Sequence, residues 1–466
     1  MARPATLGEL RDSGWESVPV KEELRRGAVA KIAAGEPLFP GVLGYEDSVL
    51  PQLENALLAG HDVIFLGERG QAKTRMIRAL IGLLDEWLPI VAGSEINDDP
   101  YNPVSAHARL LVEEHGDATP IAWVHRDQRF GEKLATPDTS IADLIGEVDP
   151  IKVAEGRYLS DELTLHYGLV PRTNRGIFAI NELPDLAERI QVGLLNVLEE
   201  RDVQVRGYTI RLPLDVFVVA SANPEDYTSR GRIITPLKDR LGSQIRTHYP
   251  RTIADEIQIM LQERTPIDGD GVPTLEEPHF MLELIAELTH LARRSPEVSQ
   301  RSGVSVRVSV ANLETVAANA VKRAVRLGEK SAAPRISDLP ALVASTAGKI
   351  ELETLGDETP EERVVDRLLG RAVSNVFARL VDIDQLDEVV GAFEGGLSIE
   401  TGETTPAADY VRWMRDTPGL EPVVRSLGAT GSPARVASAV EFVLEGLHLN
   451  RRLNKDRSGG GARYRR

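Results

Sequence analysis

The first half of the chain alternates short apolar runs with longer segments of helical spacing. Three of the runs are Val63 to Leu66, Gly176 to Ile180 and Val216 to Ala220. Short apolar runs that alternate with helices are typical of buried strands in a parallel sheet. The pattern therefore predicts an α/β domain from Phe39 to about Pro250.

The pattern changes after Pro250, where apolar residues recur at three- and four-residue spacing, as in HFMLELIAELTHLARR and SVANLETVAANAVKRAVRLG. This spacing predicts packed helices. A further helical stretch runs from about Lys21 to Ala34, before a Gly-Glu-Pro loop signal. A segment rich in Pro, Gly, Asp and His breaks the α/β rhythm and predicts an insertion. The predicted organisation is an N-terminal extension over 1–38, an α/β domain over 39–250 with the insertion at about 100–175, a helical lid over 251–350, and a C-terminal helical region over 351–466 that ends in a flexible basic tail.

Composition narrows the classes of protein that fit. The net charge of −17 over 466 residues disfavours nonspecific coating of nucleic acid. The absence of cysteine excludes disulfides and thiol catalysis and fits a reducing compartment. No stretch is long and apolar enough for a membrane span, and the N-terminus lacks the apolar segment of a signal peptide. We therefore expect a cytoplasmic protein.

The strongest chemical signal is the segment HDVIFLGERGQAKTRMIRALIGLL, in which an apolar strand leads through a glycine loop into a helix expected from Thr74 to about Trp87. In such a loop, backbone N–H groups face phosphate, Lys73 reaches the β- and γ-phosphates, and the Thr74 hydroxyl binds magnesium. Ala72 stands where the common pattern has its second glycine. The predicted nucleotide-binding residues are Gly67, Glu68, Arg69, Gly70, Gln71, Ala72, Lys73 and Thr74.

Two later strands end in further candidates. The run RGIFAINELPDL ends at Asn181 and Glu182, where a nucleotide hydrolase needs an acidic pair beside magnesium. Glu182 is placed to activate the attacking water. Asn181 replaces the usual Asp, so its contact with magnesium through water is expected to be weaker. The run LDVFVVASANPEDYT brings Asn223 to the same edge of the sheet, where an amide can hold the lytic water or the γ-phosphate.

The motifs GERGQAKT, GIFAINELPDL, ASANPEDYT and PLKDRLG, in this order, resemble the AAA+ ATPases of the magnesium-chelatase subunit I and MoxR group. The similarity covers roughly Phe39 to Leu327 and includes a segment like the family's helix-2 insert, which precedes the second acidic motif. The resemblance implies a P-loop NTPase core followed by a helical lid. It also implies that Arg240 is an arginine finger that acts on the neighbouring subunit's ATP, and that Arg307 is the lid arginine that contacts the γ-phosphate.

Similarity to this group implies that ATP and Mg²⁺ are bound, and that ATP is hydrolysed in a hexameric or similar ring. The work of the ring would be to remodel a partner or load metal into it, commonly a separate protein with a von Willebrand factor A domain. The alternative is an ATP-binding scaffold that hardly hydrolyses, because Asn181 replaces the acid. A third class, in which a related ring acts on a transcription factor or DNA, is disfavoured by the acidic charge and by the absence of a GAFTGA loop.

Overall fold

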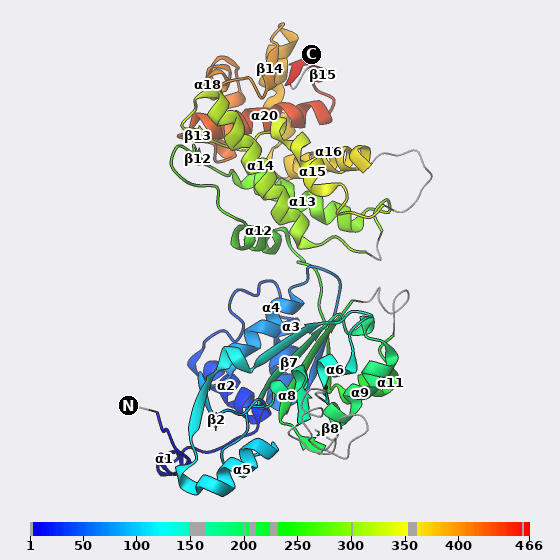
Figure 1. The fold of residues 1–466 in the computed structure, drawn as a ribbon. Helices are drawn as coiled ribbons and strands as arrows, with labels where there is room; N and C mark the ends of the chain where they lie inside the picture. Colours follow the sequence, from blue (N-terminus) through cyan, green and yellow to red (C-terminus); the bar gives the residue numbers. More distant parts are fainter. Residues whose placement is uncertain are drawn as a thin grey trace. The chain divides into compact units, whose positions relative to one another are not determined.

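The computed structural model describes residues 3–148, 164–199, 202–204, 211–223, 232–299, 302–352, 361–458 and 461–466. The chain divides into two compact units, Met1–His248 and Tyr249–Arg466 (Figure 1). Each unit has its own hydrophobic core, and each is described separately below.

A five-stranded parallel sheet forms the centre of the first unit. Its order is β11-β1-β10-β7-β4, and all four neighbouring pairs are parallel. The chain forms β1, β4, β7 and β10 in turn and then crosses to the far side of β1, so β1 lies between β10 and β11. Ligands of open α/β sheets bind outside the carboxyl ends of the strands at such a reversal. The strands are β1 (Val63–Leu66), β4 (Phe130–Leu134), β7 (Gly176–Asn181), β10 (Val216–Ala222) and β11 (Ser243–Arg246).

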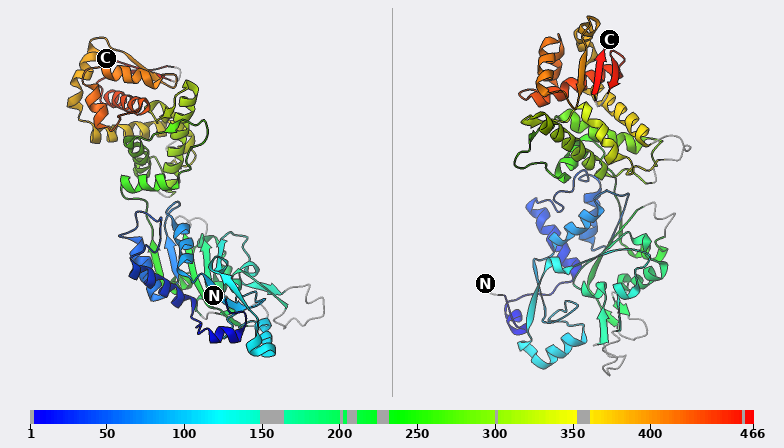
Figure 2. Two further views of the ribbon diagram at one scale, coloured as in Figure 1. Left: turned by 90° about the vertical axis from the view of Figure 1, so that its left-hand side faces the viewer. Right: turned by 45° about the horizontal axis from the view of Figure 1, so that its top comes forward.

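Helices cover both faces of this sheet, because successive strand residues point to opposite sides (Figures 1 and 2). Val63 and Phe65 pack in one core with helices α2, α3 and α4, whereas Ile64 packs in another with α9 and α11. The predicted fold class, an α/β core with flanking helices followed by a helical region, is confirmed. The helices are α1 (Leu7–Asp12), α2 (Val20–Ala34), α3 (Val49–Ala59), α4 (Lys73–Ala79), α5 (Ala106–His115), α6 (Ile141–Leu144), α8 (Leu169–Arg172), α9 (Glu188–Glu199) and α11 (Thr235–Arg240).

The N-terminal segment, expected as an extension over 1–38, belongs to the first unit. Helix α2 matches the predicted stretch and buries Val20, Leu24 and Ala28 in the sheet's core. Its Glu23 accepts two hydrogen bonds from the fully buried Arg129 guanidinium, at 2.7 and 2.5 Å. A bidentate pair that is shielded from water fixes α2 against the segment before β4.

The expected insertion at about 100–175 is only partly an insertion, because it contains β4, the edge strand of the main sheet. The segment FGEKL is short and has Gly, Glu and Lys at its centre, which hid the strand. Smaller antiparallel pairs flank β4: β2 (Trp87–Val91) with β3 (Ile121–His125), and β5 (Gly146–Val148) with β6 (Leu165–Tyr167). A third pair joins β8 (Asp202–Gln204) to β9 (Arg211–Pro213). Residues 149–163 of the resembled helix-2 insert lie outside the described residues.

The helix after the glycine loop is shorter than expected. Helix α4 ends at Ala79, a 3-10 turn follows at Leu80–Leu83, and Trp87 begins strand β2. Gly82 lies in this turn, and glycine destabilises a helix interior by about 1 kcal/mol relative to alanine.

The second unit is built mainly from helices, as predicted. Its long helices are α12 (Ile253–Glu263), α13 (His279–Arg294), α14 (Val306–Leu327), α16 (Glu361–Leu380) and α20 (Pro433–Leu449), and its shorter ones are α15 (Leu342–Thr346), α17 (Asp387–Glu394), α18 (Ala407–Asp416) and α19 (Leu420–Ser426). Phe442 of α20 stacks on Phe280 and contacts Phe377, with ring centroids 4.8 and 5.8 Å apart. One core therefore spans the expected boundary between the lid and the C-terminal region at about residue 350.

The C-terminus forms strands, which corrects the prediction of a flexible basic tail. Strands β15 (Asn454–Ser458) and β16 (Gly461–Arg465) pair with each other, and β16 also pairs with β14 (Ile399–Gly402). Tyr464 is 1% exposed and anchors β16 in the core. Two-residue strands β12 (Thr274–Leu275) and β13 (Ser331–Ala332) pair elsewhere in the unit.

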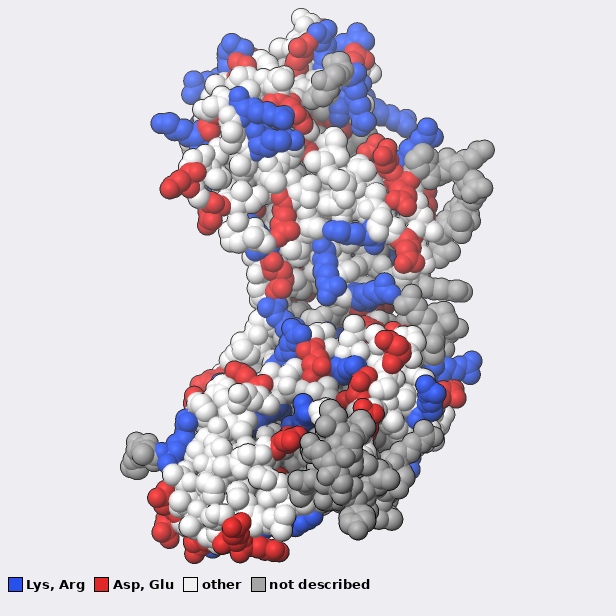
Figure 3. All heavy atoms as spheres, in the orientation of Figure 1, with Lys and Arg blue, Asp and Glu red and all other residues white. Residues whose placement is uncertain are grey.

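On the face shown in Figure 3, acidic and basic side chains are interspersed over the described surface. Within the described part of the chain, no helix has the length and apolar character needed to cross a membrane.

Candidate functional site

The glycine loop after β1 has the conformation that its sequence requires. Gly70 has a φ of 77° and Ala72 a φ of 54°, both in the left-handed region. A Cβ on Gly67 would lie 1.8 Å from Thr247 Oγ1, so only glycine fits there. Ala72, in contrast, carries a side chain in the left-handed region, which costs an L residue about 1 kcal/mol of conformational free energy.

Side chains from the first unit anchor the loop. Thr247 Oγ1 donates to Gln71 Oε1 at 2.6 Å, and the Tyr45 hydroxyl lies 2.9 Å from the Gln71 carbonyl oxygen and 2.7 Å from that of His248. Burial raises the pKa of Tyr45, so this hydroxyl keeps its proton as a donor. Sequence reasoning missed Tyr45 and Thr247 as loop anchors, although both lie within the range Phe39 to Leu327 that resembles the family.

Three predicted residues form one hydrogen-bonded chain at the carboxyl ends of β1, β7 and β10. Lys73 is buried, and its ammonium group donates to the backbone oxygens of Gly67 and Glu68, the latter at 2.7 Å, and to Asn223 Oδ1 at 2.8 Å. Asn223 Nδ2 donates in turn to the Glu182 carboxylate. A cationic, an amide and an acidic side chain that follow three separate strands therefore meet at one place.

Glu182 has a φ of 55°, which places its backbone in the left-handed region. Five described non-glycine residues have such a φ, and both Ala72 and Glu182 belong to this site. Strained backbone of this kind is concentrated at functional sites, where the surrounding structure holds it. In this conformation the Glu182 carboxylate accepts a hydrogen bond from Asn223.

Asn181 hydrogen-bonds to Ser221 and Glu132 at the end of β7. Its Oδ1 accepts from Ser221 Oγ at 3.0 Å, and its Nδ2 donates to Glu132 Oε1 at 2.6 Å. Ser221 and Glu132 were not predicted as site residues. Ser221 is the one polar residue of the buried strand VFVVASA and could have been noticed for that reason, whereas Glu132 lies in the strand that the sequence did not reveal.

The donor set fits a magnesium ion that arrives with nucleotide. Thr74 is exposed at the start of α4, directly after Lys73, which is linked through Asn223 to the Glu182 carboxylate. Among the described residues, no three His, Asp or Glu side chains gather as a metal site. Magnesium here would therefore take most of its ligands from phosphate and water, as is usual for Mg²⁺ at nucleotide sites.

The two predicted arginines have different surroundings. Arg240 ends α11 and donates through Nε to Glu199 Oε2 at 2.7 Å, in an ion pair within the chain. Arg307 lies in the first turn of α14, where its backbone N–H donates to the Ser305 hydroxyl at 3.1 Å and its side chain is exposed. Arg307 belongs to the second unit.

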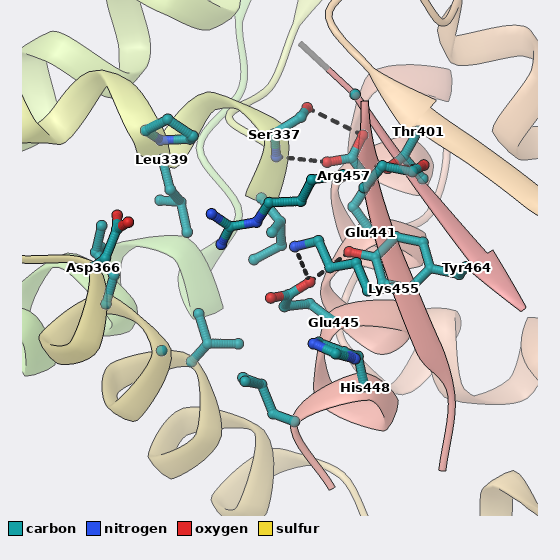
Figure 4. Close-up of a pocket in the computed structure, with 18 of the residues that line it drawn as sticks. Ser337, Leu339, Asp366, Thr401, Glu441, Glu445, His448, Lys455, Arg457 and Tyr464 are labelled. Atoms are coloured by element: carbon teal, nitrogen blue, oxygen red, sulfur yellow. Dashed lines mark hydrogen bonds and ion pairs between the residues drawn. The ribbon is translucent and has the colours of Figure 1, made fainter. Parts of the chain in front are cut away.

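A cavity of about 650 Å³ lies within the second unit, between α16, α20 and β15 (Figure 4). Two of its carboxylates accept hydrogen bonds: Lys455 Nζ donates to Glu445 at 2.6 Å, and the backbone N–H of Ser337 donates to Glu441 at 2.7 Å. The Tyr464 hydroxyl also donates to Glu445. These bonds hold the C-terminal strands on α20, and none of the predicted nucleotide residues lines the cavity.

Comparisons with known proteins agree with this geometry. The chain is 25% identical over 380 residues to magnesium-chelatase subunit ChlI of Nostoc sp., covering 78% of this chain and 95% of that protein. It is 28% identical over 264 residues to the ChlI subunit of Cyanophora paradoxa, covering 54% and 70%. This chain is an AAA+ protein related to the magnesium-chelatase I subunits. The predicted resemblance is confirmed.

A family model described as the sigma-54 interaction domain matches residues 155–243 of this AAA+ protein. That range contains Glu182, Asn223 and Arg240. Among solved structures, a magnesium-chelatase complex of subunits BchI and BchD is similar at 20% identity, with a TM-score of 0.37 over 71% of this chain and 98% of that one. The protein NtrX from Brucella abortus in complex with ATP is similar at 14% identity, with a TM-score of 0.36 over 86% and 72%.

Proposed function

We propose that this AAA+ protein binds ATP with Mg²⁺ and hydrolyses it in a ring assembly. The observation that carries the proposal is the hydrogen-bonded chain from Lys73 through Asn223 to Glu182. It links a phosphate-binding cation to a carboxylate across β10, the strand that lies between β1 and β7.

Each of these three hydrogen-bonded residues then has a role in hydrolysis. Lys73 exchanges its contacts with backbone oxygens and Asn223 for phosphate oxygens of ATP. Glu182 takes the proton of a water that attacks the γ-phosphorus, and ADP leaves with the electrons of the broken P–O bond. Asn223 holds Glu182 in place before ATP binds. Thr74 would help to hold Mg²⁺, which would supply positive charge to neutralise the phosphates.

We further propose that the assembly is a ring of identical chains in which Arg240 acts on the neighbouring subunit's ATP, with Arg307 contacting the γ-phosphate from within the same chain. Arg240 is only 28% exposed and paired with Glu199, so it would exchange one carboxylate for the transition-state charge when the ring forms. The client would be a separate protein, remodelled or loaded with metal. A von Willebrand factor A domain protein is the partner class that the family resemblance favours.

A second function is an ATP-gated scaffold with little hydrolysis. Asn181 favours it, because this residue carries no charge and its carbonyl oxygen is already bonded to Ser221. A weaker hold on magnesium would slow hydrolysis more than it would weaken ATP binding.

Steady-state ATP turnover by the full chain, with and without Mg²⁺, separates the two functions. The ATPase predicts turnover by wild type, loss of turnover with Lys73→Ala, and at most a modest gain with Asn181→Asp. The scaffold predicts ATP binding without turnover in wild type, and turnover only in Asn181→Asp. Absence of both ATP binding and turnover would contradict both functions.

A further inference from the structure

We infer that Glu132 is a magnesium-binding residue that supplies the carboxylate missing at Asn181. The inference rests on the proposed binding of ATP with Mg²⁺. Glu132 lies in the edge strand β4, outside the sequence motifs that identify the nucleotide site.

The first observation is the bond between the two side chains. Strand β4 lies beside β7 in parallel, and Glu132 Oε1 lies 2.6 Å from Asn181 Nδ2. A carboxylate only accepts, so the amide nitrogen of Asn181 faces it, and the amide oxygen faces Ser221 Oγ at 3.0 Å. Asn181 therefore presents the Glu132 carboxylate at the end of β7, where an acid is expected.

The second observation is the position of the carboxylate beside the helix that carries Thr74. The other oxygen, Glu132 Oε2, accepts from Arg78 at 2.8 and 2.9 Å. Arg78 and Thr74 are four residues apart in α4 and so share one face of that helix. Glu132 thus contacts both Asn181 at the end of β7 and Arg78 on the face of α4 that also carries Thr74.

The third observation is that Glu132 is accessible. Its side chain is 21% exposed and that of Arg78 is 62% exposed, so the ion pair opens without disturbing the core. Mg²⁺ prefers carboxylate oxygens and retained water. The Glu132 carboxylate would supply the negative charge that the neutral Asn181 amide lacks, either by direct contact with Mg²⁺ or through a magnesium-bound water.

Binding of a fluorescent ATP analogue, titrated with Mg²⁺ in the full chain, tests the inference without relying on turnover. We expect Glu132→Gln to raise the Mg²⁺ concentration at half-saturation about tenfold, which is about 1.4 kcal/mol. Glu132→Asp, which keeps the charge, should lie between this variant and wild type. The matched control Arg78→Gln removes the other partner of the ion pair and should change the half-saturation less than twofold.

The double variant Glu132→Gln with Asn181→Asp returns the carboxylate to β7 and should restore the wild-type half-saturation. Unchanged magnesium dependence in Glu132→Gln, or a double variant no better than Glu132→Gln, would overturn the inference while leaving ATP binding intact. If wild type bound the analogue without any dependence on Mg²⁺, or not at all, the proposed function itself would fail, and the inference would fail with it.

Discussion

At the residue scale, the site combines residues that were predicted from motifs with others that only the fold brings in. Lys73, Glu182 and Asn223 meet as predicted because their motifs follow β1, β7 and β10, whose carboxyl ends are neighbours. Glu132 and Ser221 could not be predicted, because their roles depend on strand pairing rather than on a motif. A local pattern shows where a strand ends but not which side chains face it across the sheet.

Ala72 offers a test of the strain in the glycine loop. Its φ of 54° favours glycine, so we expect Ala72→Gly to raise the free energy of unfolding by up to ~1 kcal/mol. Ala79→Gly is the matched control, because Ala79 has a right-handed φ of −64° and should lose about 1 kcal/mol. Urea unfolding of the full chain measures both, and a loss of stability in Ala72→Gly would contradict the account.

At the element scale, the long periodic segments were predictable and the short ones were not. Helices α2, α13 and α14 follow a sustained helical spacing and lie close to the predicted ranges. The strands β4, β14, β15 and β16 contain many polar or glycine residues. Strands β4 and β14 pair with distant parts of the chain, whereas β15 pairs with the adjacent β16. The basic C-terminus, whose sequence predicts a solvated tail, is ordered because β16 pairs with β14 and β15 and because Tyr464 is buried.

A buried acidic residue links three elements of the second unit. Glu256 of α12 accepts from Arg293 of α13 at 2.7 and 3.0 Å and from Ser309 of α14. Burial acts to raise the pKa of Glu256, but the neighbouring His290 and the hydrogen bonds from Arg293 and Ser309 outweigh it and bring the pKa below its ordinary value of 4.5. The carboxylate therefore stabilises the folded state above pH 4.5, and this stabilisation is lost as the pH falls through the lowered pKa.

We expect Glu256→Gln to lower the free energy of unfolding by ~2–3 kcal/mol at pH 7, because it leaves a buried arginine without its counter-charge. The difference from wild type should shrink as the pH falls below 4.5. Glu421→Gln, in the exposed pair with Arg425, is the control and should change stability by less than ~0.5 kcal/mol. A difference that stays constant or grows toward low pH in urea-unfolding experiments would contradict the assignment.

At the scale of the whole molecule, the account requires that neighbouring chains complete each other's sites. Arg240 in the isolated chain bonds to Glu199, so only assembly would bring it to ATP. Arg240→Ala is therefore expected to lower turnover by ~10³-fold with little change in ATP affinity. Glu199→Gln, which keeps the arginine and removes its intrachain partner, should retain turnover.

Mixing two inactive variants tests whether Arg240 acts between chains. Lys73→Ala subunits keep Arg240, and Arg240→Ala subunits keep an intact ATP loop, so mixed rings should regain part of the wild-type turnover. No recovery in mixtures that sedimentation shows to be co-assembled would contradict an action in trans.

The most direct test of the central claim measures ATP binding and phosphate release side by side in wild type and Glu182→Gln. The account predicts that both bind ATP in the presence of Mg²⁺, and that the variant releases phosphate at least ~10²-fold more slowly, because it has lost the group that accepts the proton of the attacking water. Equal phosphate release by the two proteins would contradict the role of Glu182 and, with it, the assignment of this site as the hydrolytic centre.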